Sequence, residues 1–248
     1  MHLFDCECSI GKLKVPQPGS FSSASELVAE MDYLGINEAL VYHSLAKEHN
    51  VAFGNALLCE SIGGIHRLHG CWILQPHFTG ELPAPEIVAT EMLEKGIRAA
   101  RLFPGDNGQR FSLSDWSCGQ LFEVLAEHRI PLFIDKDLIE WDRIVSICKT
   151  YPALPLVITE VWCKETRYLY PLFEQFPNFH ISLSRFIGHQ CLEDVCRRFG
   201  SGGLLFGSKM PVFTPGPVIA MLTYAEISEK EQADIASDNL RRLLNEVA

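Results

Sequence analysis

The stretch Leu204-Leu205-Phe206-Gly207-Ser208-Lys209-Met210-Pro211 guides the interpretation of the whole chain. It is a short apolar run that ends abruptly in glycine, serine, a lysine and a proline, which is typical of a buried strand that stops at a tight turn. An ammonium group at the end of a buried strand is costly unless an anionic group faces it. The sequence should therefore supply an anionic partner for Lys209 elsewhere.

Strand-like and helix-like segments alternate along the chain. The strand-like runs are short, apolar and often β-branched, as expected for strands that are buried on both faces. Eight such units in 248 residues predict an α/β protein, a closed (β/α)8 TIM-like barrel that forms a single domain over residues 1–248. A doubly wound open sheet is the alternative, but the Gly-x-Gly-x-x-Gly fingerprint of that fold is missing from the sequence. The expected strands cover residues 3–10, 38–43, 68–77, 99–103, 131–136, 155–160, 179–183 and 204–208, and the last expected helix covers residues 229–247.

The composition limits the class of partner. The net charge is −10 at pH 7 and no basic run is present, which argues against nucleic acid and anionic membrane and favours a small-molecule substrate. The N-terminus lacks the features of a signal peptide, and no apolar run reaches about 18 residues. The nine cysteines include no Cys-x-x-Cys pair, so we expect reduced thiols, no cysteine-bound metal and a cytoplasmic location. A homodimer is left open, because no stretch marks a dimer face.

Charged and polar residues follow the expected strands at their carboxyl ends, where a barrel carries its chemistry. Side chains alternate along a strand, so Glu7 and Ser9 share one face of the first strand. If that face is inward, three carboxylates surround the mouth of the barrel, with Lys209 and Arg101 as counter-cations. We predict catalytic roles for Lys209, Asp135, Glu160, Glu7 and His77, and substrate contacts for Arg101, His43, Ser9, Trp72 and Arg185.

Each of these roles has a plainer structural alternative. Trp72 could pack in the core, provided that its indole N–H finds a partner. His43 and His77 could bond only to the loop backbone that follows their strands. Asp135 could serve only as a salt-bridge partner for Lys136 or Lys209.

Several motifs resemble the amidohydrolase-related family. The stretch from Phe4 to Gly11 is similar to its opening strand, usually written Asp-x-His-x-His-x-Gly, and residues 204–211 are similar to its closing strand, Leu-Leu-Phe-Gly-Ser-Asp-x-Pro. Residues 177–184 fit its seventh strand, and residues 239–244 resemble its Asn-Ala-x-Arg-Leu-Leu signature. The resemblance spans almost the whole chain. It implies a TIM-like barrel and an ancestry among metal-dependent hydrolases and non-oxidative decarboxylases.

The departures from the family pattern concern its metal ligands. Glu7 and Ser9 stand where the family has its first-strand histidines, Asp135 and Glu160 where it has the fifth- and sixth-strand histidines, and Lys209 where it has an aspartate. Because an ammonium and a divalent ion repel each other, we expect the metal site to be lost and no cofactor to bind. Lys209 and Arg101 would then replace the metal as the electrophilic element, with a carboxylate or a histidine as general base.

Four functional hypotheses follow. The first is a metal-independent hydrolase or lyase that acts on a small carboxylate, lactone or amide. The second uses Lys209 as a Schiff-base nucleophile, which the surrounding carboxylates oppose because they keep the lysine protonated. The third is a non-catalytic protein that binds a metabolite or a partner through the same mouth. The fourth is an enzyme that holds Mg²⁺ or Mn²⁺ through Glu7, Asp135 and Glu160.

Overall fold

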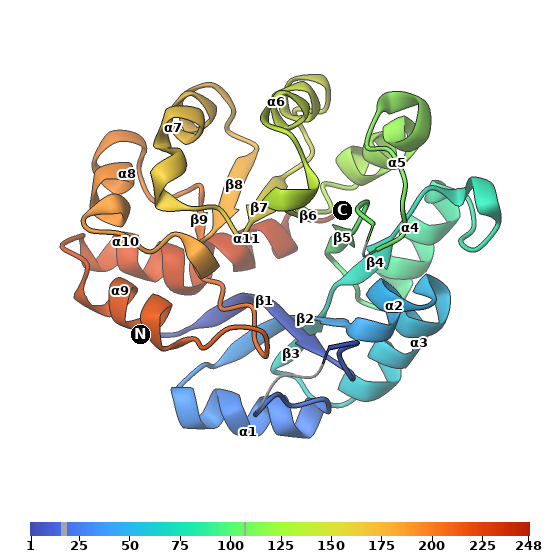
Figure 1. Ribbon diagram of the computed structural model, residues 1–248, viewed down its shortest axis with the longest axis horizontal. Coiled ribbons are helices and arrows are strands. Elements are labelled where there is room, and N and C mark those ends of the chain that lie inside the picture. The colour runs from blue at the N-terminus through green and yellow to red at the C-terminus, as the bar shows by residue number, and fades with distance from the viewer. Residues whose placement is uncertain (16–18, 107) are drawn as a thin grey trace.

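Parallel strands form the centre of the molecule and helices surround them (Figure 1). A computed structural model describes residues 1–15, 19–106 and 108–248. The predicted α/β TIM-like barrel is confirmed by the parallel pairing of successive strands. The strands are β1 (Phe4–Ile10), β2 (Glu38–His43), β3 (Leu68–Gly70), β4 (Trp72–Leu74), β5 (Ala100–Leu102), β6 (Leu132–Asp135), β7 (Leu156–Thr159), β8 (Phe179–Ser182) and β9 (Leu204–Leu205).

The helices follow the strands in the expected order. The first of them illustrates local control by sequence, because Ser23 and Glu26 form a capping box at its start and Gly35 ends it with a φ of 71°. The helices are α1 (Ala24–Leu34), α2 (Ser44–Glu48), α3 (Val51–Ile62), α4 (Pro85–Glu94), α5 (Asp115–Glu127), α6 (Trp141–Thr150), α7 (Thr166–Gln175), α8 (Cys191–Phe199), α9 (Gly216–Tyr224), α10 (Glu229–Ala233) and α11 (Asn239–Asn245). Short 3₁₀ turns lie at η1 (His77–Thr79), η2 (Lys136–Leu138), η3 (Cys163–Glu165) and η4 (Leu183–Arg185), and a π-helical turn, η5 (Asp234–Asp238), separates α10 from α11.

The predicted third strand, residues 68–77, is divided into two. The break falls at Cys71, so that β1, β2 and β3 pair in one sheet and β4 to β9 in another. The two sheets are joined at one edge by the chain itself, which passes from β3 through Cys71 to β4, and at the other by backbone hydrogen bonding between β1 and the residues after β9. The amide of Cys71 donates to the carbonyl of Val41 at 2.8 Å, and the amide of Cys6 donates to the carbonyl of Phe206 at 2.9 Å.

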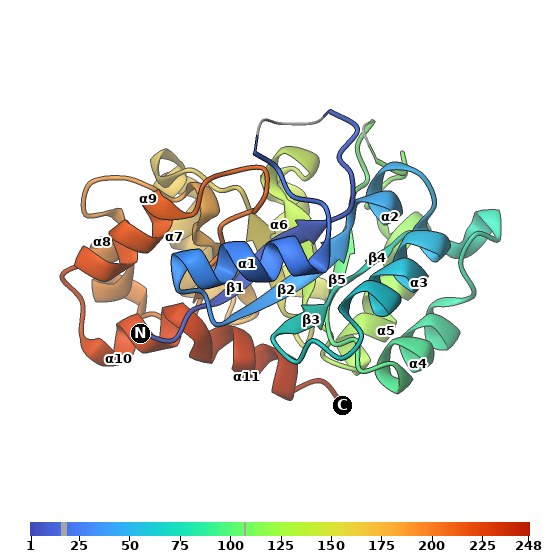
Figure 2. The ribbon, with the colours of Figure 1, turned by 90° about the horizontal axis from the view of Figure 1, so that it is seen from below.

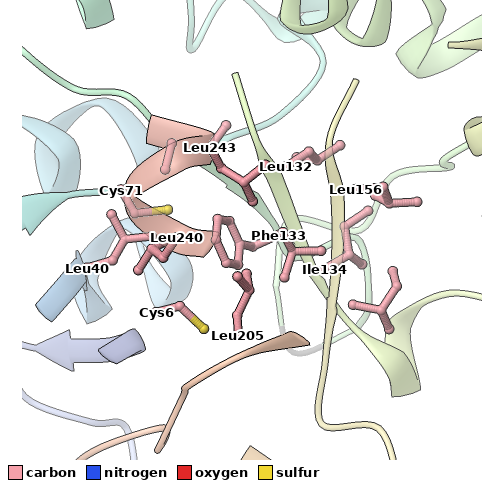
Figure 3. Packing of buried hydrophobic residues seen from close by; sticks show 14 of the residues in the cluster. Cys6, Leu40, Cys71, Leu132, Phe133, Ile134, Leu156, Leu205, Leu240 and Leu243 are labelled. Atoms are coloured by element: carbon pink, nitrogen blue, oxygen red, sulfur yellow. The ribbon is translucent and has the colours of Figure 1, made fainter. Parts of the chain in front are cut away.

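Apolar side chains fill the lower interior of the barrel, and α11 lies across its floor. Figure 3 shows Leu240 and Leu243 of α11 close to Phe133 of β6 and Leu205 of β9. In Figure 2, α11 runs below the strands, while α2 lies above them. This packing leaves the carboxyl ends of the strands as the place for polar groups. Within the described ranges, no helix combines the length and the apolar character needed to span a bilayer.

Candidate active site

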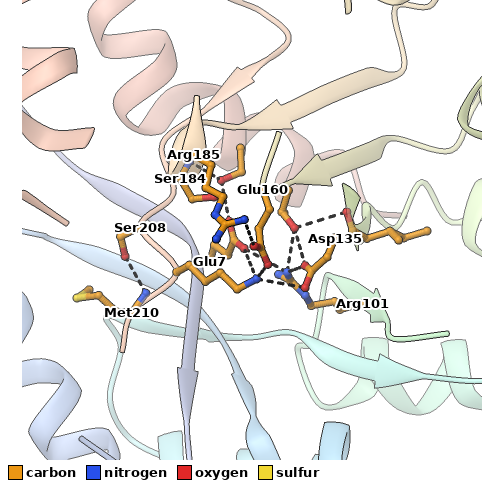
Figure 4. Close-up of polar contacts among 12 residues, drawn as sticks. Glu7, Arg101, Asp135, Glu160, Ser184, Arg185, Ser208 and Met210 are labelled. Atoms are coloured by element: carbon orange, nitrogen blue, oxygen red, sulfur yellow. Dashed lines mark hydrogen bonds and ion pairs between the residues drawn. The ribbon is translucent and has the colours of Figure 1, made fainter. Parts of the chain in front are cut away.

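Five charged side chains converge at the carboxyl ends of the strands (Figure 4). We call this group the charged cluster; its members are Glu7, Arg101, Asp135, Glu160 and Lys209. The Nζ atom of Lys209 contacts Glu160 directly and lies 3.2 Å from Asp135 Oδ2 and 3.9 Å from Glu7 Oε1. Arg101 contacts Asp135 and places its Nη2 atom 3.2 Å from Glu7 Oε1. The anionic partners that the sequence required for Lys209 are therefore present.

Glu7 reaches the cluster from a bulged strand. The register between β1 and β2 shifts between Asp5 and Cys8, so the simple alternation expected for this strand does not hold there. The hydroxyl of Ser182 in β8 donates to Glu7 Oε2 at 2.8 Å. Gly207 makes room for this contact, because a Cβ atom at that position would lie 2.2 Å from Ser182 Oγ.

Glu160 and Lys209 both have left-handed backbone conformations, with φ values of 58° and 61°. Such values are uncommon for residues other than glycine and cost on the order of 1–3 kcal/mol each. Consecutive side chains of a strand normally point to opposite faces. The left-handed turn at Glu160 changes this, so that Thr159, the last residue of β7, and Glu160 both contact other members of the cluster. The strain is thus located at the two residues that form the central ion pair.

Burial makes the charges of the cluster interdependent. Arg101 is 2% exposed, and Glu7 is 1% exposed. Burial alone would raise the pKa of Asp135, but the charges of Arg101 and Lys209 and a hydrogen bond from Thr159 hold it well below its usual range. Burial likewise opposes the charge of Arg101, and the neighbouring Asp135 and Glu7 outweigh it and raise the arginine pKa.

Other predicted site residues lie at varying distances from the cluster. Arg185 joins it directly, since its Nη1 atom is 3.4 Å from Glu160 Oε2. Ser9 lies within hydrogen-bonding reach of Tyr42, whose ring is 5.3 Å from the Arg101 guanidinium carbon. His43 caps α2 through its Nδ1 atom, which accepts from the amide of Leu45 at 3.2 Å.

Trp72 and His77 are not brought to the cluster. Trp72 instead lines a cavity of about 330 Å³ between α3 and α4, and its indole N–H has no partner within the described residues. His77 lies on η1, where its ring is 4.4 Å from the exposed ring of Phe78. Trp72 is the first residue of β4 and His77 lies beyond the end of that strand, so neither stands at its carboxyl end.

Four residues at the site were missed from the sequence. Thr159 accepts from Arg101 at 3.0 Å and donates to Asp135 Oδ1 at 2.7 Å, so it belongs to the cluster. Ser182 fixes Glu7, as described above. Lys47 and Tyr42 lie beside the ring of Phe103 next to the cluster. Thr159 and Ser182 are the last residues of β7 and β8, so they could have been predicted from their positions at strand ends. Nothing in the local sequence marks Lys47.

The three carboxylates offer a set of oxygen donors. One oxygen each from Glu7, Asp135 and Glu160 lies within 4.8 Å of the others, which makes this trio a candidate metal-binding group. Carboxylate oxygens suit hard divalent ions such as Mg²⁺ and Mn²⁺. Arg101 and Lys209 lie among the same oxygens, so a divalent ion would share its ligands with these two cations.

Comparison with known proteins gives structural matches alone. Neither a family model nor a curated protein matches the sequence. A 5-carboxyvanillate decarboxylase from Sphingomonas paucimobilis superposes with a TM-score of 0.76 at 15% identity, covering 98% of this chain and 99% of that one. The chain has the fold of that enzyme.

Two further solved structures extend the likeness. A dihydroxybenzoic acid decarboxylase from Polaromonas, solved with bound manganese and the inhibitor 2-nitroresorcinol, gives a TM-score of 0.72 at 15% identity, with 98% and 97% of the two chains covered. An amidohydrolase II gives 0.73 at 12% identity, with 98% and 99% covered. The predicted resemblance to amidohydrolase-related proteins is therefore confirmed as a likeness of fold over almost the whole chain.

The prediction that the metal site is lost and that no cofactor binds is contradicted. A protein of the same fold holds manganese, and this chain retains three carboxylates that are close enough to bind such an ion. The prediction failed because it gave the repulsion between the Lys209 ammonium and a divalent ion more weight than the three carboxylates that could bind the ion. Oxygen ligands alone are sufficient for Mg²⁺ or Mn²⁺.

Proposed function

We propose that the protein is a lyase of the amidohydrolase-related type that decarboxylates a small organic acid. The observation that carries this proposal is the convergence of Lys209 with Glu7, Asp135 and Glu160 at the mouth of the barrel. The likeness to two decarboxylases supports it as well.

The electrostatics at Asp135 disfavour proton abstraction by that carboxylate. Hydrolysis of an amide or a lactone needs a base that takes a proton from water, and the depressed pKa of Asp135 makes its carboxylate a weak base. Decarboxylation needs a proton donor: the bond between the carboxylate carbon and the neighbouring carbon breaks, CO2 leaves, and the electron pair stays on that carbon. The Lys209 ammonium would then give a proton to this carbon and regain one from water. Arg101 and Thr159 would hold Asp135 in place for this transfer.

A divalent ion fits the same group of residues. Glu7, Asp135 and Glu160 would hold it, and when bound it would supply positive charge that orients an anionic oxygen of the substrate.

The test is an assay for CO2 release. The purified protein is incubated with 2,6-dihydroxybenzoate and 5-carboxyvanillate, each with added Mn²⁺ and after dialysis against a chelator. A matched set of aromatic amides and lactones is assayed in parallel. We expect CO2 from at least one acid, and we expect Lys209→Met to lower kcat by about 10²- to 10⁴-fold while the variant stays folded.

Lys230→Met is the control. Lys230 is an exposed residue of α10 that pairs with Asp234 of η5, away from the strand ends. It should leave the rate unchanged. Hydrolysis of an amide or a lactone without CO2 release would mean that the protein is a hydrolase and not a lyase. Binding of the acids without any turnover would make the protein a non-catalytic binder. Either result contradicts the proposal.

A further inference from the structure

Lys47 on α2 is a cation beside the cluster that the proposed chemistry does not use. Its Nζ atom lies 4.5 Å from the centre of the Phe103 ring, and the Arg101 guanidinium lies 5.2 Å from the same ring. Lys47 is close enough to Asp135, Lys209 and Arg101 for their charges to affect its protonation. It is partly buried, and no carboxylate of residues 1–15, 19–106 or 108–248 lies within 4 Å of its ammonium group.

The neighbouring charges do not satisfy Lys47. Asp135 already contacts Arg101 and Lys209. Glu48, the next residue in the chain, accepts a hydrogen bond from the backbone amide of Lys14 at 2.7 Å. Burial lowers the pKa of Lys47, which is the expected effect for an ammonium group that has lost water without gaining an anion.

The short helix that carries Lys47 is fixed in position. The amide of Gln109 donates to the carbonyls of Ala46 and Lys47 at 3.0 and 2.8 Å. At the other end, His43 accepts from the Leu45 amide and the Ser44 hydroxyl donates to the Lys12 carbonyl. Two distant segments and the end of β2 therefore hold this helix, so Lys47 has a fixed support beside the Phe103 ring.

A decarboxylase gains little from a strong ion pair with the carboxylate that leaves. That group loses its charge in the reaction, so an ion pair would stabilise the bound substrate more than the transition state and would slow the step. A cation that has no carboxylate partner within the protein can instead bind a substrate group that stays charged throughout the reaction.

We infer that Lys47 binds a second anionic group of the substrate, one that remains on the product. This rests on the proposed function and assigns the substrate to the class of small organic diacids. The rings of Phe103 and Tyr42, 5.5 Å apart and both buried, lie next to this position as an apolar backing for the lysine.

The experiment compares a diacid with a monoacid. Isothermal titration calorimetry measures the dissociation constants of benzene-1,3-dicarboxylate and benzoate for the wild-type protein, Lys47→Met, Lys47→Arg and Lys136→Met. Lys136 is the matched control, because its Nζ atom also lies over a ring, 4.6 Å from the centre of Trp141, but it already donates to the carbonyl of Ile139 at 3.0 Å.

We expect the wild-type protein to bind the diacid at least 10-fold more tightly than the monoacid. Lys47→Met should abolish this preference while leaving benzoate binding unchanged; Lys47→Arg should retain most of it, and Lys136→Met all of it. A preference that survives in Lys47→Met, or that is absent from the wild-type protein, overturns the inference. Because binding is measured separately from CO2 release, an inactive protein that still shows the Lys47-dependent preference would overturn the lyase proposal alone.

Discussion

Arg101 provides the positive charge at the inner side of the cluster. It is almost fully buried in β5 and contacts two carboxylates and the hydroxyl of Thr159. A buried ion pair contributes little net stability compared with apolar residues, but removal of one partner leaves an uncompensated charge. Arg101 therefore helps to hold the pKa of Asp135 below its usual range and is the nearest cation to the buried Glu7 carboxylate.

This role can be measured with Arg101→Met. We expect the variant to lose about 3–5 kcal/mol of unfolding free energy at pH 7, because Glu7 and Asp135 would lose the nearer of their two cationic partners in a buried setting. Urea unfolding followed by circular dichroism gives the value. Arg242→Met is the control, since Arg242 lies 3.5 Å from Glu246 with both side chains more than 40% exposed, and it should change stability by about 1 kcal/mol or less. Equal losses in the two variants would show that Arg101 does not have this role.

The individual side chains were predictable from the sequence to different degrees. Glu7, Asp135, Glu160, Arg101 and Lys209 were identified because each stands at or near the end of an apolar run, and parallel strands bring such ends together. Lys47 was not identified, because its position depends on how Gln109 and the Lys12 carbonyl hold α2, and these contacts join segments far apart in the chain.

At the scale of the elements, α2 depends on close packing against α3. A Cβ atom at Gly54 would lie 2.1 Å from the backbone nitrogen of Ala46, so glycine is needed where the two helices touch. Strand alternation failed for similar reasons of local geometry: the bulge in β1 and the left-handed residues Glu160 and Lys209 redirect side chains in ways that a two-residue period does not describe.

Gly54→Ala tests the packing of α2. We expect it to destabilise the protein by about 1–3 kcal/mol through overpacking, and to weaken the preference for a diacid because Lys47 moves with its helix. Thermal unfolding and the calorimetric comparison above measure the two effects. Gly119→Ala in α5 is the matched control, since its Cβ would meet its nearest neighbour at an ordinary 3.5 Å and alanine favours a helix. A Gly54→Ala variant as stable as Gly119→Ala would contradict this description of the contact.

At the scale of the whole molecule, the fold was predictable and the division of the third strand was not. The alternation of buried runs and amphipathic segments over the chain determines a barrel, because few other arrangements bury so many short parallel strands. The break at Cys71 has no marker in the apolar pattern of residues 68–77, which remains compatible with one continuous strand.

The floor of the barrel is closed by a second charged group, centred on Glu38 at the start of β2. Its carboxylate contacts Arg241 of α11 at 2.7 Å, and His2 and His69 of β3 at 2.8 Å each, so it connects the N-terminus, two strands and the C-terminal helix. Burial alone would raise the pKa of Glu38, but these hydrogen bonds outweigh it and lower the pKa from 4.5 to about 2.

Glu38→Gln should therefore destabilise the protein in a pH-dependent way. A carboxyl group whose pKa is lower in the folded state contributes stability that is fully present above its unfolded pKa of 4.5. That contribution is lost as the pH falls toward about 2, where the folded form also becomes protonated. We expect the wild-type protein to exceed Glu38→Gln by about 2–3 kcal/mol at pH 7, and by progressively less between pH 4.5 and pH 2.

Urea unfolding at pH 7, 4.5 and 3 measures this difference, with Glu94→Gln, an exposed position on α4, as the control that should show little difference at any pH. A difference between the wild-type protein and Glu38→Gln that stays constant with pH would mean that the ionised carboxylate does not link the floor of the barrel. The packing of α11 on Phe133 and Leu205 would then be what holds the C-terminal helix in place.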